Sequence, residues 1–286
     1  MTGPGAANPA VHDFGGTGPP LLISHATGFH GFCYQPMADA IADRVHAVAF
    51  DYRGHGDTPV PEGWPEQSQV DWEEYADDAE VVALGLAADG ERPSAFGHSM
   101  GGTCLLIVAH RHPMLFERLV LFEPIVPAPD GPGVGDPDDS PLVSAARRRR
   151  DTFGSREEAF ANYANKPPLN VFHPDALLAY VSHGFADDAE GVRLKCSPQL
   201  EAATFAAGGR HQAWQYLRGI DVPVLVVSGR RDPDQGPALM APLIAEELPR
   251  GSLLRLDRVD HFGPMSHPDL IGQVITDAMG GAVGRR

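Results

Sequence analysis

Cysteine is scarce in this sequence, and its scarcity excludes a protein held together by disulfide bonds. The 286 residues contain three cysteines, Cys33, Cys104 and Cys196, and no C-x-x-C pair. Three scattered cysteines cannot form a disulfide framework. We therefore expect the protein to work in a reducing compartment.

Basic residues are also few. The chain has 22 Lys and Arg against 38 Asp and Glu, which gives a formal net charge of −16. Nucleic acids and anionic membranes attract basic surfaces, so we expect neither as a partner. The expected partner is a small-molecule substrate, and a homodimer is left open. The length suits one large domain or a domain with an insertion.

Long apolar runs are missing as well. No stretch of about 18 apolar residues could form a membrane-spanning helix. Residues 1–16 have neither the basic start nor the apolar centre of a signal peptide. From these absences we predict a cytoplasmic protein.

Short apolar runs alternate with longer helical patterns along most of the chain. The runs are continuous, as expected of parallel strands buried on both faces. This alternation predicts an α/β fold with a doubly wound, mostly parallel sheet. The expected strands are 21–24, 45–51, 94–97, 119–123, 222–228 and 253–256, and the expected helices are 72–88, 102–110, 237–248 and 269–279.

One segment breaks this alternation, because no strand pattern is found between residues 123 and 220. It begins with residues 127–141, whose richness in Pro, Gly and Asp predicts a mobile loop that acts as a lid. We predict an all-helical cap over residues 126–217, inserted into a core formed by 1–125 and 218–286. The expected helical pieces of the cap are 142–153, 156–165, 175–183, 199–207 and 211–217.

Four consecutive arginines, Arg147 to Arg150, lie in the first of these pieces. A charged run of this kind usually forms a solvated face. The alternative is an anion-binding role toward an acidic substrate.

The strongest chemical motif is G-x-S-x-G, which reads GHSMG at residues 97–101. It lies between a predicted strand and a predicted helix, which is the context of a nucleophile elbow. Glycines allow the close chain packing of a tight turn, and the helix start directs N–H groups toward the serine. The motif therefore predicts Ser99 as a nucleophile, with an ordinary glycine-rich turn as the alternative.

A serine hydroxyl needs a base, and the base needs an orienting acid. In this architecture they follow in the order Ser, Asp or Glu, His. We predict His261 as the base and Asp232 as the acid, because each follows a predicted strand at the sheet edge that carries Ser99. Glu123, at the end of an earlier strand, is the rival acid. Asp260 is disfavoured because it adjoins His261 in sequence.

An acyl-transfer site also needs two N–H donors for the oxyanion. We predict that the amide of Met100 is one of them. The other should come from the loop after the first predicted strand, with Thr27 preferred and Gly28 second. Phe29 and Phe262 flank these positions and are predicted to bind substrate as pocket walls.

These segments together resemble the α/β-hydrolase superfamily, in its esterase- and lipase-like branch with a helical cap. PPLLISHATGFHGFCYQPM resembles the strand, loop and helix that carry the oxyanion position, with Ala26 in place of the usual glycine. FDYRGHGDT, GHSMGG, SGRRDP and VDHFGPMSHPDL resemble further segments of the family. The resemblance implies the fold and the Ser99, Asp232 and His261 triad. Haloalkane dehalogenases and epoxide hydrolases, by contrast, carry an aspartate at the elbow.

The predicted function is a serine hydrolase that cleaves a small or medium ester, lactone or thioester through an acyl-enzyme. This chemistry needs no cofactor and no metal. Three alternatives stay open: a carbon–carbon bond hydrolase, a cofactor-free perhydrolase or haloperoxidase, and a ligand-binding receptor on a hydrolase scaffold. An arginine projecting into the pocket would favour the carbon–carbon bond hydrolase, whose substrate is a diketone-like acid.

Overall fold

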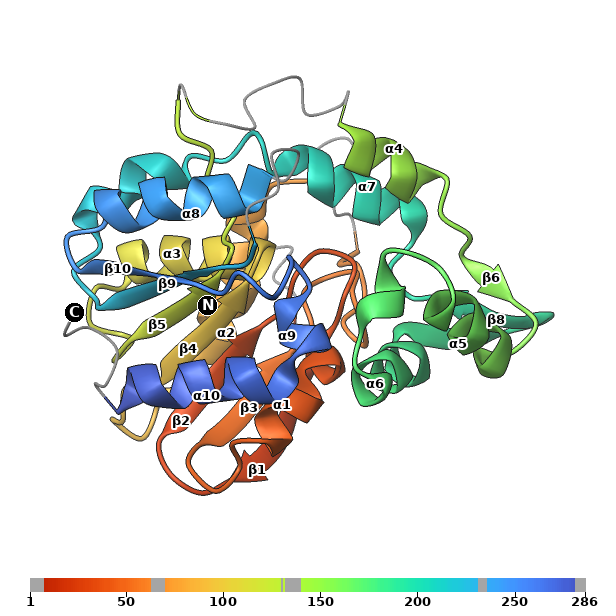
Figure 1. Cartoon of the computed structure of the whole chain (residues 1–286), viewed down its shortest axis with the longest axis horizontal. Coiled ribbons are helices and arrows are strands. Elements are labelled where there is room, and N and C mark those ends of the chain that lie inside the picture. Colours follow the sequence, from red (N-terminus) through yellow and green to blue (C-terminus); the bar gives the residue numbers. More distant parts are fainter. Residues whose placement is uncertain (1–7, 63–69, 130, 132–139, 231–235, 281–286) are drawn as a thin grey trace.

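A seven-stranded sheet forms the centre of the protein (Figure 1). The computed structural model describes residues 8–62, 70–129, 131, 140–230 and 236–280. The strand order is β1-β3-β2-β4-β5-β9-β10, and only β1 runs antiparallel to its neighbour. The strands are β1 (Val11–Gly16), β2 (Pro20–Ser24), β3 (His46–Phe50), β4 (Ser94–His98), β5 (Leu119–Phe122), β9 (Val224–Ser228) and β10 (Gly251–Arg255).

The predicted α/β fold and its six strands are confirmed. The continuous apolar runs of β4, β5 and β9 are buried at every residue, as parallel strands covered on both faces require. Strand β1 was not predicted. Its sequence, VHDFGG, has no continuous apolar run, because every residue of the strand is exposed or half-buried. Its pairing with β3 also shifts register between Asp13 and Gly15.

Helices cover both faces of the sheet (Figure 1). Leu22 of β2 belongs to an apolar cluster on the face covered by α2, α3 and α8. Its neighbour Leu21 belongs to a second cluster, on the face covered by α1 and α10. Successive residues of a strand point to opposite faces, which explains this division. The core helices are η1 (Gly31–Tyr34), α1 (Gln35–Asp39), α2 (Trp72–Leu86), α3 (Met100–Arg111), α8 (Gly236–Glu247), α9 (Gly263–Ser266) and α10 (Pro268–Met279).

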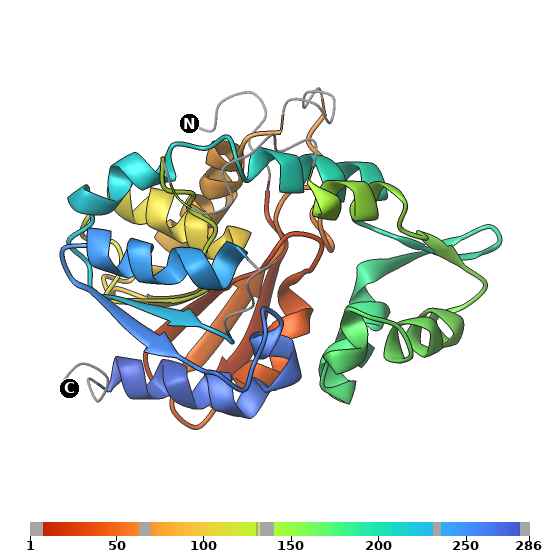
Figure 2. The same ribbon diagram turned by 45° about the horizontal axis from the view of Figure 1, so that its top comes forward.

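Between β5 and β9, residues 141–207 form a group of elements beside the core, which we call the cap, whereas residues 213–219 pack against α3 and α8 of the core (Figure 2). The prediction that the cap is all helical is wrong, because it also holds the three-stranded antiparallel sheet β6-β8-β7. These strands have two to four residues, too few to show an alternating pattern in the sequence. The elements between β5 and β9 are α4 (Pro141–Arg147), β6 (Thr152–Phe153), α5 (Arg156–Ala164), η4 (Leu169–Val171), α6 (Pro174–Gly184), β7 (Phe185–Asp188), β8 (Gly191–Leu194), α7 (Pro198–Ala207) and η5 (Ala213–Gly219).

Most of the loop 127–141 lies outside the described residues, so its role as a mobile lid stays a prediction. The predicted helix 142–153 is shorter than expected and ends at Arg147. In the part of the chain that the structure describes, no helix is both long and apolar enough to cross a bilayer.

Candidate active site

Ser99 lies in a sharp turn between β4 and α3. Its φ of 55° and ψ of −119° are strained for a residue with a side chain. The turn depends on neighbours without a Cβ. A Cβ on Gly101 would lie 2.3 Å from the backbone oxygen of Ser24, and one on Gly97 would lie 2.6 Å from Gly102 Cα. The structure therefore shows the strand–turn–helix context that the motif predicted.

His261 is held by a buried carboxylate. Its Nδ1 lies 2.6 Å from Oε2 of Glu123, which follows β5 directly and is 1% exposed. The other oxygen, Oε1, accepts a hydrogen bond from the Gly229 backbone N–H at 2.8 Å. An ionised carboxylate only accepts hydrogen bonds, so Nδ1 carries the proton and Nε2 is left as the basic nitrogen.

Within the described residues, the carboxylate that contacts the His261 ring is thus Glu123, the rival acid that the sequence left open. Asp232, the preferred acid of the sequence analysis, lies outside the described residues. Glu123 has a positive φ of 46°, a second strained position one strand away from Ser99. Its place directly after a strand that neighbours the elbow strand is the signal that could have favoured it.

The backbone of His261 is anchored by a buried polar chain. Its carbonyl oxygen accepts from Nε2 of His98 at 2.9 Å, and His98 Nδ1 lies 2.8 Å from the Tyr34 hydroxyl. Because Nε2 of the neutral ring carries the proton, Nδ1 accepts from the Tyr34 hydroxyl, which itself accepts from the backbone N–H of Ala26 at 3.1 Å. Burial holds the pKa of His98 well below its ordinary value, which keeps the ring neutral in this chain of hydrogen bonds.

Thr27 and Met100, the two predicted oxyanion donors, come together in the structure. Thr27 follows the end of β2, Met100 begins α3, and the Thr27 hydroxyl donates to Met100 Sδ at 3.4 Å. Both residues are buried. Parallel pairing of β2 with β4 brings the loop after Ser24 to the same sheet edge as Ser99. Their amides as oxyanion donors remain a prediction.

Aromatic rings surround this edge of the sheet. The predicted wall residues Phe29 and Phe262 lie 6.3 Å apart between ring centroids, and Phe262 lies 6.0 Å from the His261 ring. Two rings from the cap complete the set: Phe172 lies 5.6 Å from Phe262, and Tyr180 lies 5.7 Å from Phe29. The sequence did not reveal Phe172 and Tyr180, because periodicity does not place the cap on the core.

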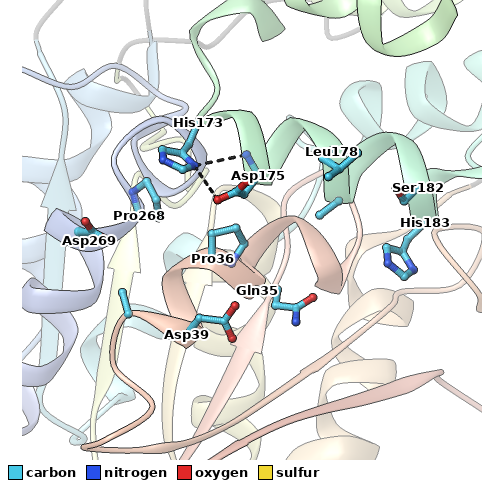
Figure 3. A pocket seen from close by; sticks show the side chains of 12 residues that line it. Gln35, Pro36, Asp39, His173, Asp175, Leu178, Ser182, His183, Pro268 and Asp269 are labelled. Carbon is cyan, nitrogen blue, oxygen red and sulfur yellow. Dashed lines mark hydrogen bonds and ion pairs between the residues drawn. The ribbon is translucent and has the colours of Figure 1, made fainter. Parts of the chain in front are cut away.

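A groove of about 520 Å³ lies elsewhere, between α1, α6 and α10 (Figure 3). His173 and Asp175 line it, with His173 Nδ1 3.7 Å from Asp175 Oδ2. Its lining includes none of Ser99, Glu123 and His261. We therefore do not assign the reaction to this groove.

His12, Asp51 and Asp57 form the group of potential metal ligands found among the described residues. Their protein contacts already account for the arrangement. Asp51 accepts from the backbone N–H groups of Gly31 and Asp57, and its carboxylate lies 2.8 Å from His12 Nε2. The Lys195 ammonium contacts Asp57 from the cap. These contacts thus hold the loop after β3 against Gly31, His12 and the cap.

The fold has counterparts among known proteins. A model of the alpha/beta hydrolase family matches residues 21–274. The chain belongs to this family.

The α/β hydrolase is 24% identical over 264 residues to a 2-(acetamidomethylene)succinate hydrolase from Mesorhizobium japonicum, covering 92% of this chain and 88% of that protein. It is 26% identical over 278 residues to a pimeloyl-[acyl-carrier protein] methyl ester esterase from Neisseria meningitidis, covering 91% and 93%. A crystal structure of an E-2-(acetamidomethylene)succinate hydrolase matches the fold with a TM-score of 0.77 at 22% identity, covering 96% of this chain and 98% of that one. These relatives are hydrolases.

Proposed function

We propose that this α/β hydrolase is a serine hydrolase that cleaves a small or medium carboxylic ester, lactone or thioester. The observation that carries the proposal is the short contact between His261 Nδ1 and Glu123 Oε2 beside the strained Ser99 turn. A serine at an elbow and a histidine fixed by a buried carboxylate are the parts that acyl transfer requires.

The reaction begins when Ser99 Oγ attacks the substrate carbonyl and His261 Nε2 takes the hydroxyl proton. Glu123 keeps the other ring nitrogen protonated and stabilises the positive charge that forms on the ring. The amides of Thr27 and Met100 bind the oxyanion of the tetrahedral intermediate. His261 then protonates the leaving group, and the acyl group stays on Ser99.

Hydrolysis of the acyl-enzyme repeats these steps with water. His261 takes a proton from a water molecule that attacks the acyl carbon, and it returns the proton to Ser99 Oγ as the free acid leaves. The relatives named above support hydrolytic chemistry, and one of them is named as a methyl ester esterase.

The test is the turnover of 4-nitrophenyl butyrate by the wild type and by Ser99→Ala. We expect the wild type to hydrolyse the ester and the variant to lose at least about a thousandfold in kcat, because only the attacking oxygen is removed. Ser144→Ala, in cap helix α4, serves as the matched control. A wild type without activity, as expected of a ligand-binding receptor, or a Ser99→Ala variant within about tenfold of it, would contradict the proposal.

A further inference from the structure

One arginine of the 147–150 run differs from the others. Arg147, Arg148 and Arg150 are exposed, as a solvated face predicts, whereas the side chain of Arg149 is 18% exposed. Arg149 follows α4 and turns toward the inside of the cap. Its Nη1 donates to both carboxylate oxygens of Glu201, at 2.7 and 2.9 Å, and its Nη2 donates to the Tyr180 hydroxyl.

This ion pair lies against the loop that carries the predicted oxyanion donor. Gly28 has a φ of 78°, and a Cβ added to it would lie 2.3 Å from Oε1 of Glu201. Tyr180, which binds the same guanidinium, lies 5.7 Å from the Phe29 ring. A substrate whose carbonyl is held at Thr27 would therefore extend toward the Arg149–Glu201 pair.

The guanidinium keeps hydrogen-bonding capacity beyond these contacts. It has five N–H groups, and its Nε donates to none of the described residues. Its carbon lies 5.5 Å from the ring of Tyr163, whose buried hydroxyl has no hydrogen-bond partner within the described part of the chain. Both groups can therefore donate to an oxygen atom of a ligand: the guanidinium only donates, and the Tyr163 hydroxyl can donate or accept.

Charge decides which acceptor fits. Glu201 neutralises Arg149, so a buried carboxylate added beside the pair would be left without a compensating charge. A neutral carbonyl oxygen can accept from the guanidinium without that cost. Although burial disfavours the charged form, Tyr180 and Glu201 raise the pKa of Arg149 well above its ordinary value, so the arginine stays a donor.

We infer that Arg149 binds an uncharged carbonyl oxygen on the acyl group of the substrate, and that Glu201 excludes acids from this position. The inference rests on the proposed function and narrows its substrate class to acyl groups with a second, neutral carbonyl. Because Glu201 already compensates the charge of Arg149, this arginine disfavours the acidic substrate that an unpaired arginine would favour.

Three 4-nitrophenyl esters of matched size test this inference. The pentanoate is apolar, the 4-oxopentanoate carries a neutral ketone, and the hemisuccinate carries a carboxylate in the same place. We expect kcat/KM of the wild type to be about tenfold higher for the 4-oxopentanoate than for either other ester, which is the effect of one hydrogen bond to a charged donor.

Two variants separate the roles of the pair. In Glu201→Gln the arginine charge is no longer compensated, so the hemisuccinate should become the preferred ester, by about tenfold over the 4-oxopentanoate. The double variant Arg149→Met, Glu201→Gln removes both buried charges together and so avoids leaving one of them unpaired. In this variant the ratio of 4-oxopentanoate to pentanoate should fall to about one. Arg148→Met, an exposed neighbour, is the control and should keep the wild-type ratios.

Two results would overturn the inference. One is equal kcat/KM for all three esters in the wild type, which contradicts the subsite and leaves the proposed function standing. The other is a preference for the 4-oxopentanoate that survives in the double variant. If the wild type hydrolyses none of the esters, the proposed function fails, and this inference fails with it.

Discussion

Glu123 has a strained backbone, and each of its two carboxylate oxygens has a polar partner. One oxygen accepts from Gly229 and the other holds His261, so the side chain has a fixed position in a buried site. These two contacts place the carboxylate directly beside the ring nitrogen that it would have to orient. We therefore propose Glu123 as the orienting acid, the role for which the sequence analysis preferred Asp232.

Glu123→Gln should therefore lower kcat for ester hydrolysis by about 10³ to 10⁴, because an amide can favour the wrong histidine tautomer. Asp232→Asn is the matched comparison and should change kcat by less than about tenfold. The measurement is the steady-state hydrolysis of 4-nitrophenyl butyrate by both purified variants. The opposite order of the two effects would return the orienting role to Asp232.

The sequence predicts Ser99 as the nucleophile and His261 as the base because local signals surround both residues. Ser99 is defined by its glycines and by the strand and helix on either side, and His261 by its place after a strand. The acid was harder to assign, since Glu123 and Asp232 both follow strands of the same sheet. Only the packed structure shows which carboxylate the His261 ring faces.

The turn between β4 and α3 is the element on which the proposed chemistry depends most. Gly101→Ala would place a Cβ against the backbone oxygen of Ser24, which cannot move as a flexible side chain can. We expect the free energy of unfolding to fall by about 1–3 kcal/mol, the usual effect of overpacking. Guanidinium unfolding measures the change.

Gly85→Ala is the control for this variant. Gly85 lies exposed in α2, and a Cβ there would meet no atom within 4 Å. The substitution should raise stability by about 0.5–1 kcal/mol, because alanine favours helix over glycine. Equal stability of Gly101→Ala and the wild type would contradict the close approach at the turn.

The elements of the core could be predicted from the sequence, and those of the cap only in part. Core strands such as β9 are continuous apolar runs, and helices such as α2 repeat apolar residues with helical spacing. The cap strands β6 and β7 are short and largely polar or exposed, so tertiary pairing rather than local pattern forms them. The contacts of Arg149 and Phe172 depend on that tertiary arrangement, which explains why the sequence did not show them.

Across the whole molecule, several histidines are buried in the neutral form. Burial lowers the pKa of His25 to about 3 and the pKa values of His30 and His211 to about 4. An exposed histidine in the unfolded chain titrates near 6.5. As the pH falls below about 6.5, the unfolded chain therefore binds protons that the folded protein does not, and stability is lost toward pH 4.

We expect the free energy of unfolding to fall between pH 6.5 and 5, by about 1.4 kcal/mol per pH unit for each such histidine once the unfolded chain is protonated. Urea unfolding at a series of pH values measures this slope. His211→Gln should reduce it by about the share of one histidine. A free energy of unfolding that stays constant from pH 7 to pH 5 would disprove this account of the buried rings.

The central claim is that Ser99 is a nucleophile activated by His261. It is tested most directly by treating the folded protein with a fluorophosphonate at pH 7.5 and locating the adduct by peptide mass spectrometry. This reagent reacts with an activated serine and needs no knowledge of the natural substrate. We predict one adduct on the peptide that contains Ser99, and none on Ser99→Ala. An unlabelled wild-type protein, or an adduct at another residue, would contradict the claim.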